Sequence, residues 1–189
     1  MKELEITVKV NSNYQKLHSD LKKIGFIKTK ETLMYDTYMI DKNIDISNMR
    51  DLDILSKCII VRNIDDYNAF IYKIKEYDEY ENIISQQKIE CKIDNTKNGI
   101  KLLNMINYKE LLNIKSKLIF YKRDDLDILV QIVNDDFILI EMEDEKFDNI
   151  DDMIKSFEKL DIDYDRTNYF VKKAQIILRK GDENVCRWG

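Results

Sequence analysis

The chain opens with the stretch Lys2-Glu-Leu-Glu-Ile-Thr-Val-Lys-Val10, in which polar and apolar residues alternate strictly. Alternation with a period of two is typical of a β-strand with one buried face. The apolar residues point to one side of this strand, and the polar residues Glu3, Glu5, Thr7 and Lys9 point to the other. The opening stretch therefore predicts a strand that collects charge on one face.

Further strands follow the same rule, and the helices between them are short. Period-two or β-branched runs predict strands at residues 31–40, 57–63, 68–76, 85–93, 114–123, 126–134 and 137–143. Apolar residues at helical spacing predict helices at 14–24, 99–113, 149–160 and 167–179. Strands joined mostly by tight turns indicate an α+β fold with an antiparallel sheet rather than βαβ units. Eight strands are also enough to close a small barrel.

Length and composition limit the classes of protein. The 189 residues suit one domain, which we expect at 1–180 with a loose tail at 181–189. The net charge of −5 argues against a general nucleic-acid binder. The apolar runs are too short to span a bilayer, and three cysteines without metal-ligand spacing indicate reduced thiols. We therefore predict a cytoplasmic protein without a membrane segment.

Charged residues recur on the polar side of several predicted strands. An acid–x–acid pair occurs at Glu3 and Glu5 and again at Glu141 and Glu143. Cations and one further acid share strand faces at Lys73 with Lys75, at Lys88 with Glu90 and Lys92, and at Lys115 with Lys117. Charges facing outward would make a plain charged surface, whereas charges facing into a closed barrel would line a tunnel.

A tunnel of this kind would bear a large desolvation cost unless its charges had partners. A polyphosphate with a divalent ion supplies both kinds of partner. Lysine and arginine neutralise phosphate oxygens, and paired carboxylates hold Mg²⁺ or Mn²⁺. The charges of such a tunnel therefore predict a polyphosphate, held together with a divalent ion, as the partner.

The order of these motifs resembles the CYTH superfamily, the triphosphate tunnel metalloenzymes. Glu3-Leu4-Glu5 is similar to the N-terminal E-x-E-x-K signature of that family. The resemblance extends over nearly the whole chain, through segments similar to the D-T-Y-F, L-R-I-R, T-x-K, K-x-R, F-V-E-I-E and S-Y motifs: Tyr35–Tyr38, Ile59–Arg62, Ile71–Lys73, Ile114–Lys117, Phe137–Glu143 and Asn168–Tyr169. It implies a closed eight-stranded β-barrel flanked by helices, the triphosphate tunnel.

The resemblance also implies roles for individual residues. The implied metal ligands are Glu3, Glu5, Glu141 and Glu143. The implied triphosphate ligands are Arg62, Lys73, Lys115 and Lys117, to which we add Lys9, Lys75 and Lys88 because they share predicted strand faces with charged residues of the motifs. The implied activity is metal-dependent hydrolysis of a small triphosphate, or cyclisation of ATP to cyclic AMP. No catalytic residue is assigned.

Three positions depart from the family pattern. Thr7 stands in place of the signature lysine, Ile60 in place of the first arginine of L-R-I-R, and Gln131 in place of a metal-binding aspartate unless a gap brings in Asp127. Each lost charged contact costs about 1.5–3 kcal/mol. The alternative is therefore a domain that keeps the fold and binds a polyphosphate or nucleotide without turnover.

A third interpretation is a charged surface used for protein contacts, for which Glu5 and Arg62 should both be exposed. A homodimer through the outer face of the barrel stays open as well.

Overall fold

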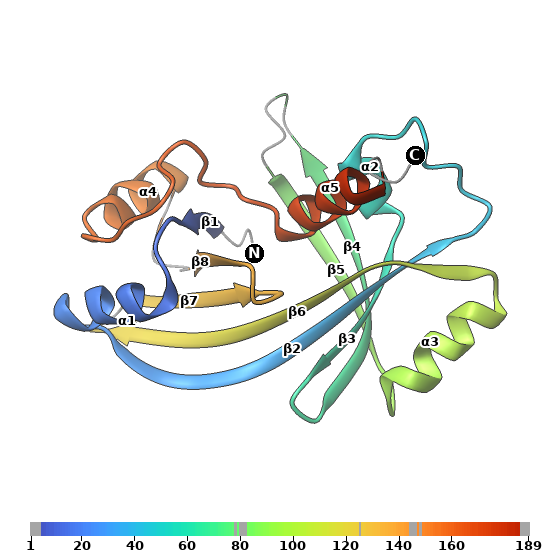
Figure 1. Ribbon diagram of the computed structural model, residues 1–189, viewed down its shortest axis with the longest axis horizontal. Helices are drawn as coiled ribbons and strands as arrows, with labels where there is room; N and C mark the ends of the chain where they lie inside the picture. The colour runs from blue at the N-terminus through green and yellow to red at the C-terminus, as the bar shows by residue number, and fades with distance from the viewer. Residues whose placement is uncertain are drawn as a thin grey trace. The chain divides into compact units, whose positions relative to one another are not determined.

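A computed structural model describes residues 5–77, 79, 83–124, 126–143, 147 and 149–185. The segment 186–189, part of the predicted tail, and Glu3, a predicted metal ligand, lie outside the described residues. The strands are β1 Glu5–Val10, β2 Ile27–Asp41, β3 Ile59–Ile64, β4 Tyr67–Tyr77, β5 Ile83–Lys92, β6 Tyr108–Arg123, β7 Leu126–Val133 and β8 Phe137–Glu143. The helices are α1 Tyr14–Lys23, α2 Asp51–Ser56, α3 Thr96–Met105, α4 Ile150–Glu158 and α5 Lys173–Val185 (Figure 1).

The strands form one eight-stranded sheet in the order β1-β8-β7-β6-β2-β3-β4-β5. The ladders β1–β8, β8–β7, β7–β6, β2–β3, β3–β4 and β4–β5 are antiparallel. The predicted α+β class with an antiparallel sheet is confirmed. Within the described residues β1 and β5 stand at the two ends of this order, so hydrogen-bonded closure into a barrel is not confirmed.

Two predicted boundaries in the second half of the chain are wrong. The helix predicted at 99–113 ends as α3 at Met105, because Asn107 takes a left-handed conformation (φ 73°) and a strand begins at Tyr108. The helix predicted at 167–179 begins only at Lys173 and continues to Val185, so it enters the predicted tail. Residues 169–171 instead run beside β1, where the Thr7 amide donates to the Tyr169 carbonyl at 2.8 Å. The short helix α2 was not predicted.

The chain divides into two compact units. The first unit comprises residues 1–33 and 116–171, and the second comprises residues 34–115 and 172–189. The long strands β2 and β6 contribute residues to both units. We describe each unit by itself.

In the first unit, α1 and α4 cover one face of the short strands (Figure 1). Asn13 caps α1 by accepting from the Lys16 amide, and Gly25 (φ 93°) ends the turn that follows. Leu17 of α1 and Phe157 of α4 are fully buried against alternate residues of the sheet. Those alternate residues are Ile6, Val8, Val10, Ile128, Val130, Ile138, Ile140 and Met142. The opposite face of these strands is therefore the one that carries Glu5, Thr7 and Lys9.

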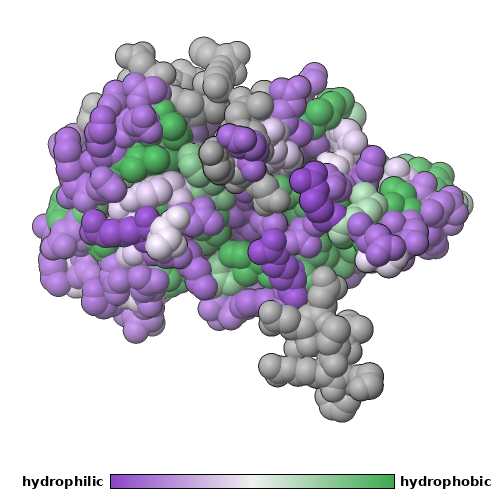
Figure 2. Space-filling view, turned by 90° about the horizontal axis from the view of Figure 1, so that it is seen from above, coloured by the Kyte–Doolittle hydropathy of each residue, from purple (hydrophilic) through white to green (hydrophobic). Residues whose placement is uncertain are grey.

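In the second unit, α3 packs on one face of β2 and β3 through Leu103, Met39 and Val61. Helix α5 contacts α2, where the Arg179 guanidinium pairs with the Asp51 carboxylate at 2.6 Å. Figure 2 shows hydrophilic residues over much of the face seen from above, with smaller hydrophobic patches between them. None of the helices in the described part of the chain is long and apolar enough to cross a membrane.

Candidate functional site

One face of β2–β5 in the second unit gathers a row of mainly cationic side chains. Residues directly opposite each other in a ladder share a face. The pairs Asp36↔Arg62, Ile71↔Glu90 and Lys73↔Lys88 therefore put these side chains together. We call this surface the cationic face; its charged members are Asp36, Arg62, Lys73, Lys75, Lys88, Glu90 and Lys92. Five cations stand against two carboxylates, which leaves a net positive charge.

The centre of the cationic face is an ion pair between Asp36 and Arg62. Arg62 donates from Nε to Oδ1 and from Nη2 to Oδ2 of Asp36, both at 2.7 Å. The Asp36 side chain is fully buried, and the Arg62 side chain is 21% exposed. Burial lowers the pKa of Arg62, but the hydrogen bonds and charge of Asp36 outweigh this effect and raise it. The two-point contact fixes the guanidinium and leaves Nη1 without a hydrogen bond among the described residues.

A second charged group lies on β4 and β5. Lys88 Nζ is 2.7 Å from Glu90 Oε2, and the Tyr67 hydroxyl donates to the same carboxylate. These hydrogen bonds, from Lys88 first and then Tyr67, lower the pKa of Glu90, and the bond to Glu90 raises the pKa of Tyr67. Lys73 stands opposite Lys88 in the ladder. The acid holds Lys88 in place while Lys73 adds charge beside it.

The described predicted metal ligands, Glu5, Glu141 and Glu143, lie in the first unit on the face opposite α1 and α4, which we call the acidic face. Glu5 faces Glu143, and Thr7 faces Glu141. Thr7 Oγ1 donates to Glu5 Oε1 at 3.1 Å, and Gln131 Nε2 donates to Glu141 Oε2 at 2.6 Å. Glu5 and Glu143 are exposed, and Glu141 is half-buried.

These carboxylates fit a hard divalent ion in donor type, because Mg²⁺ and Mn²⁺ prefer oxygen ligands. The fit in number is weaker. Gln131 supplies a neutral amide beside Glu141 where the family has an acid. The described residues contain no group of three or more potential ligands in metal-binding geometry, in a set that leaves out Glu3. Glu5, Glu141 and Glu143 are thus candidate ligands from the chemistry of their oxygens and their register.

The middle of the acidic face is apolar and buried. Leu118 faces Gln131 and Leu129 faces Glu141 across the β7 ladders, and Leu118 is only 4% exposed. Ser116, on the same face as Leu118, is fully buried, and its Oγ has no hydrogen-bond partner among the described residues. The described residues of this middle part offer no cation to a phosphate.

Two predicted phosphate ligands of β6 fall on the other side of their strand. Lys117 lies between Ser116 and Leu118 in an unbroken ladder, so it shares its face with Ile119 and Tyr121. Its Nζ pairs with Glu31 at 2.6 Å, and this bond, with that of Lys28, lowers the pKa of Glu31.

Lys115 is likewise on the side of Asn113, which accepts from Thr37 at 2.8 Å, whereas Asp36 points the opposite way. The structure therefore does not bring Lys115 to the cationic face or Lys117 to the acidic face. Lys9 does lie on the acidic face, exposed and opposite Leu139.

Sequence reasoning missed the roles of Asp36 and Tyr67 as partners of charged residues. Asp36 was recognised as part of a strand motif, and its ladder position opposite Arg62 was the available signal. Of the cysteines, Cys58 is buried, and burial raises the pKa of its thiol to about 12. Cys91 is exposed. The third interpretation, a charged surface for protein contacts, expects Glu5 and Arg62 to be exposed. Glu5 is exposed, but the Arg62 side chain is only 21% exposed.

The chain was compared with known proteins. No protein-family model matches it. A Methanocaldococcus jannaschii protein named "putative adenylate cyclase" is 26% identical over 95% of this chain and 99% of its own length. Among solved structures, a "putative adenylyl cyclase" from Hippeastrum with "a dominant triphosphatase activity" matches with a TM-score of 0.65 at 15% identity, covering 95% of this chain and 96% of that chain.

A "putative adenylate cyclase" from Vibrio parahaemolyticus matches with a TM-score of 0.63 at 11% identity, covering 95% of this chain and 98% of that chain. These structural matches are matches of fold. Together with the motif order and the eight-stranded sheet, the 26% identical relative supports the resemblance of the chain to the CYTH superfamily, as a divergent member.

Proposed function

We propose that the protein binds a small triphosphate or nucleotide through the cationic face and processes it with a divalent ion. The observation that carries the proposal is the net positive face of β2–β5 around the fixed Arg62 guanidinium. Hydrolysis to release phosphate and cyclisation of ATP to cyclic AMP are the two activities considered. The names of the relatives support both, since one is a putative cyclase and another has a dominant triphosphatase activity.

In this proposal the chain's cations hold the phosphate groups. Arg62 Nη1 is free of hydrogen bonds among the described residues and donates to a phosphate oxygen, while Nε and Nη2 stay on Asp36. Lys73, Lys75 and Lys88 neutralise further oxygens as point charges, with Glu90 holding Lys88 in position. The result is an oriented phosphate chain whose negative charge is largely compensated.

The metal part of the proposal rests on the acidic face. Glu5, Glu141 and Glu143, with Glu3 as a fourth candidate, would hold Mg²⁺ or Mn²⁺, which stabilises charge developing on phosphate oxygens. Lys9 and Lys122, the latter paired with Asp127, are described cations of this face. Closure of the sheet into the family's barrel, a cytoplasmic location and a small-molecule partner in place of nucleic acid belong to the same proposal. A homodimer remains an alternative to a monomer.

Binding without turnover is the second candidate, and the acidic face favours it. Ser116 and Leu118 of β6 lie on the acidic face, and Leu118 is buried opposite Gln131. A neutral amide on Glu141 reduces the charge available to a metal, and a buried leucine cannot neutralise a phosphate. A domain of this kind would bind phosphate through the cationic face of the second unit and would not catalyse hydrolysis or cyclisation.

The test is a turnover assay on the purified protein. Tripolyphosphate, thiamine triphosphate and ATP are supplied separately with Mg²⁺ or Mn²⁺, and released phosphate and cyclic AMP are followed. The Glu5→Ala/Glu143→Ala variant removes two exposed acids of the acidic face. Glu31→Ala, which removes a partly exposed acid from the other side of the sheet, is the matched control.

Turnover that disappears in the double variant and persists in Glu31→Ala would support the enzyme and identify its substrate. Absence of turnover together with tight tripolyphosphate binding would support the second candidate. Absence of both turnover and binding would overturn the proposal.

A further inference from the structure

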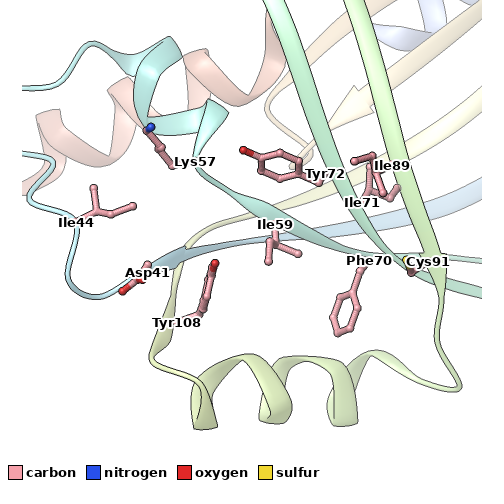
Figure 3. A pocket seen from close by; sticks show the side chains of 10 residues that line it. All are labelled: Asp41, Ile44, Lys57, Ile59, Phe70, Ile71, Tyr72, Ile89, Cys91 and Tyr108. Atoms are coloured by element: carbon pink, nitrogen blue, oxygen red, sulfur yellow. The ribbon is translucent and has the colours of Figure 1, made fainter.

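A cavity lies beside β3–β5, mainly on the side that faces away from the cationic face. It has a volume of about 420 Å³, and all its lining residues belong to the second unit. Figure 3 shows Ile44 and Lys57 at one end and Ile89 and Cys91 at the other, with Ile59 between them. Phe70 and Tyr72 line it from β4, whereas Lys73 of the same strand points to the cationic face. The two surfaces therefore share strands and use opposite faces.

The walls of this cavity are mainly apolar and aromatic. Ile59, Phe70, Tyr72 and Tyr108 are half-buried, and Ile89 is 49% exposed, which is high for a large aliphatic side chain. The hydroxyls of Tyr72 and Tyr108 bond no side chain in the described part of the molecule. Apolar walls with a few unsatisfied polar groups are typical of small-molecule sites, which have volumes of roughly 300–1,000 Å³.

The rim of the cavity carries one cation, Lys57, and one acid, Asp41. Lys57 makes no ion pair within the described ranges, and the nearby Asp53 is already bound by Arg50 at 2.8 and 3.0 Å. Asp41, the acid of the rim, accepts from the Asn43 amide at 2.8 Å and from the Asn107 side chain at 3.4 Å. These hydrogen bonds hold Asp41 among the asparagines beside it. Lys57 is therefore the group of the rim that is available to pair with an anionic ligand.

We infer that this cavity is a second ligand site, specific for a small amphipathic anion. The ligand has an aromatic or short aliphatic body that covers Ile59, Phe70 and Ile89. Its single anionic group, a carboxylate, sulfonate or phosphate monoester, pairs with Lys57, and the tyrosine hydroxyls donate to it or to a neighbouring polar atom. This site is independent of the proposed triphosphate function because the strand side chains that cover the ligand, Ile59, Phe70 and Ile89, point to the face opposite the cationic face.

The probes are 8-anilinonaphthalene-1-sulfonate, an aromatic anion, and N-phenyl-1-naphthylamine, a similar ring system without the charge. Fluorescence titrations give the dissociation constant of each for the wild type, Lys57→Ala and Ile89→Ala. We expect one saturable site for the sulfonate. Lys57→Ala should weaken the sulfonate about tenfold, the loss of one charge-assisted contact, and leave the neutral probe unchanged. Ile89→Ala should weaken both probes.

Cys91 supplies a readout that does not depend on fluorescence. In a Cys186→Ser background Cys91 is the reactive thiol, because Cys58 is buried with its pKa raised to about 12. Bound sulfonate should slow maleimide labelling of Cys91, and this protection should decrease in Lys57→Ala. Near-UV circular dichroism establishes that each variant is folded, since partly unfolded chains also bind the dye.

Tripolyphosphate serves as the control for the cationic face. It should neither displace the sulfonate nor protect Cys91, and Lys57→Ala should bind tripolyphosphate as the wild type does. Sulfonate binding that is equal in Lys57→Ala, that leaves Cys91 unprotected or that tripolyphosphate abolishes would overturn the inference. Failure of tripolyphosphate to bind at all would count against the proposed function and leave this site untouched.

Discussion

The two units put different chemistry on the sheet faces that the family resemblance marks as functional. In the second unit the cationic face keeps Arg62, Lys73 and Lys88 and organises them with two acids. In the first unit the acidic face keeps exposed acids at the strand ends but is apolar and buried in the middle, at Leu118 and Leu139. The charge of the second unit and the buried apolar middle of the first make the cationic face the stronger candidate for phosphate binding in the proposed function.

The largest expected effect comes from the ion pair of the second unit. Arg62→Met leaves the fully buried Asp36 carboxylate without its partner, which should reduce the free energy of unfolding by about 3–5 kcal/mol. Urea unfolding at pH 7 measures the loss. The double variant Asp36→Leu/Arg62→Met removes both charges and should recover most of the stability.

If the double variant is as unstable as the single one, the loss comes from packing rather than from an unpaired charge. The Asp36–Arg62 pair would then serve packing, as Leu118 does in the acidic face. The two faces would no longer differ in the way described above.

The second prediction uses two neighbours on β6. Leu118→Ala should cost about 2–5 kcal/mol because it opens a cavity in the buried middle of the acidic face. Lys117→Ala, one step along the strand and on the other side, should cost at most about 1 kcal/mol, because it removes only the partly exposed ion pair with Glu31. Chemical denaturation of both variants measures the difference. Equal effects would mean that the register of this strand is shifted from the one described.

The third prediction concerns Gln131, whose amide donates to Glu141. Gln131→Asp restores the family's acid and places two carboxylates in contact, so the metal-free variant should lose about 1–3 kcal/mol. Mn²⁺ should then raise its melting temperature more than that of the wild type, because a bound metal relieves the repulsion. Thermal unfolding with Mn²⁺ and with EDTA measures both. A variant insensitive to Mn²⁺ would remove the acidic face as a candidate metal site.

The smallest effect is the pH dependence of the Glu31–Lys117 pair. Hydrogen bonds from Lys117 and Lys28 lower the pKa of Glu31, so its contribution to stability is complete above the usual glutamate pKa of about 4.3. The contribution is lost as the pH falls through the lowered pKa of the folded state. The stability difference between wild type and Glu31→Gln should therefore be at most about 1 kcal/mol at pH 7 and vanish near pH 2. A difference that is constant across this range would contradict the assignment.

Much of the sheet could be predicted from alternation alone. The opening stretch became β1 with Ile6 and Val8 buried and Lys9 exposed, because only one side of that strand meets helices. The late helix was misplaced since Thr167–Phe170 has helix-compatible residues but bonds to the edge of β1. The backbone amides of an edge strand need hydrogen-bond partners from elsewhere in the fold, and the local sequence of the partner segment does not show this.

The charges of β6 show where alternation is insufficient. Its sequence places apolar residues on both sides, at Leu118, Ile119 and Phe120, so the pattern does not specify which side faces the helices. A shift of one residue moves each side chain to the other face. Only the ladder with Gln131 settles that Leu118, and not Lys117, lies on the acidic face. The face of Arg62 was easier to predict, because its strand carries charge on one side alone.

Isothermal titration with tripolyphosphate, at one low salt concentration and without added metal, tests directly whether the cationic face binds the phosphate chain. The variant Lys73→Ala/Lys88→Ala removes two cations of the cationic face, and Lys115→Ala/Lys117→Ala removes the same charge from the other side of the sheet. The account predicts a loss of affinity of at least about tenfold in the first variant and little change in the second. Equal losses in both, or a loss confined to the second, would contradict it.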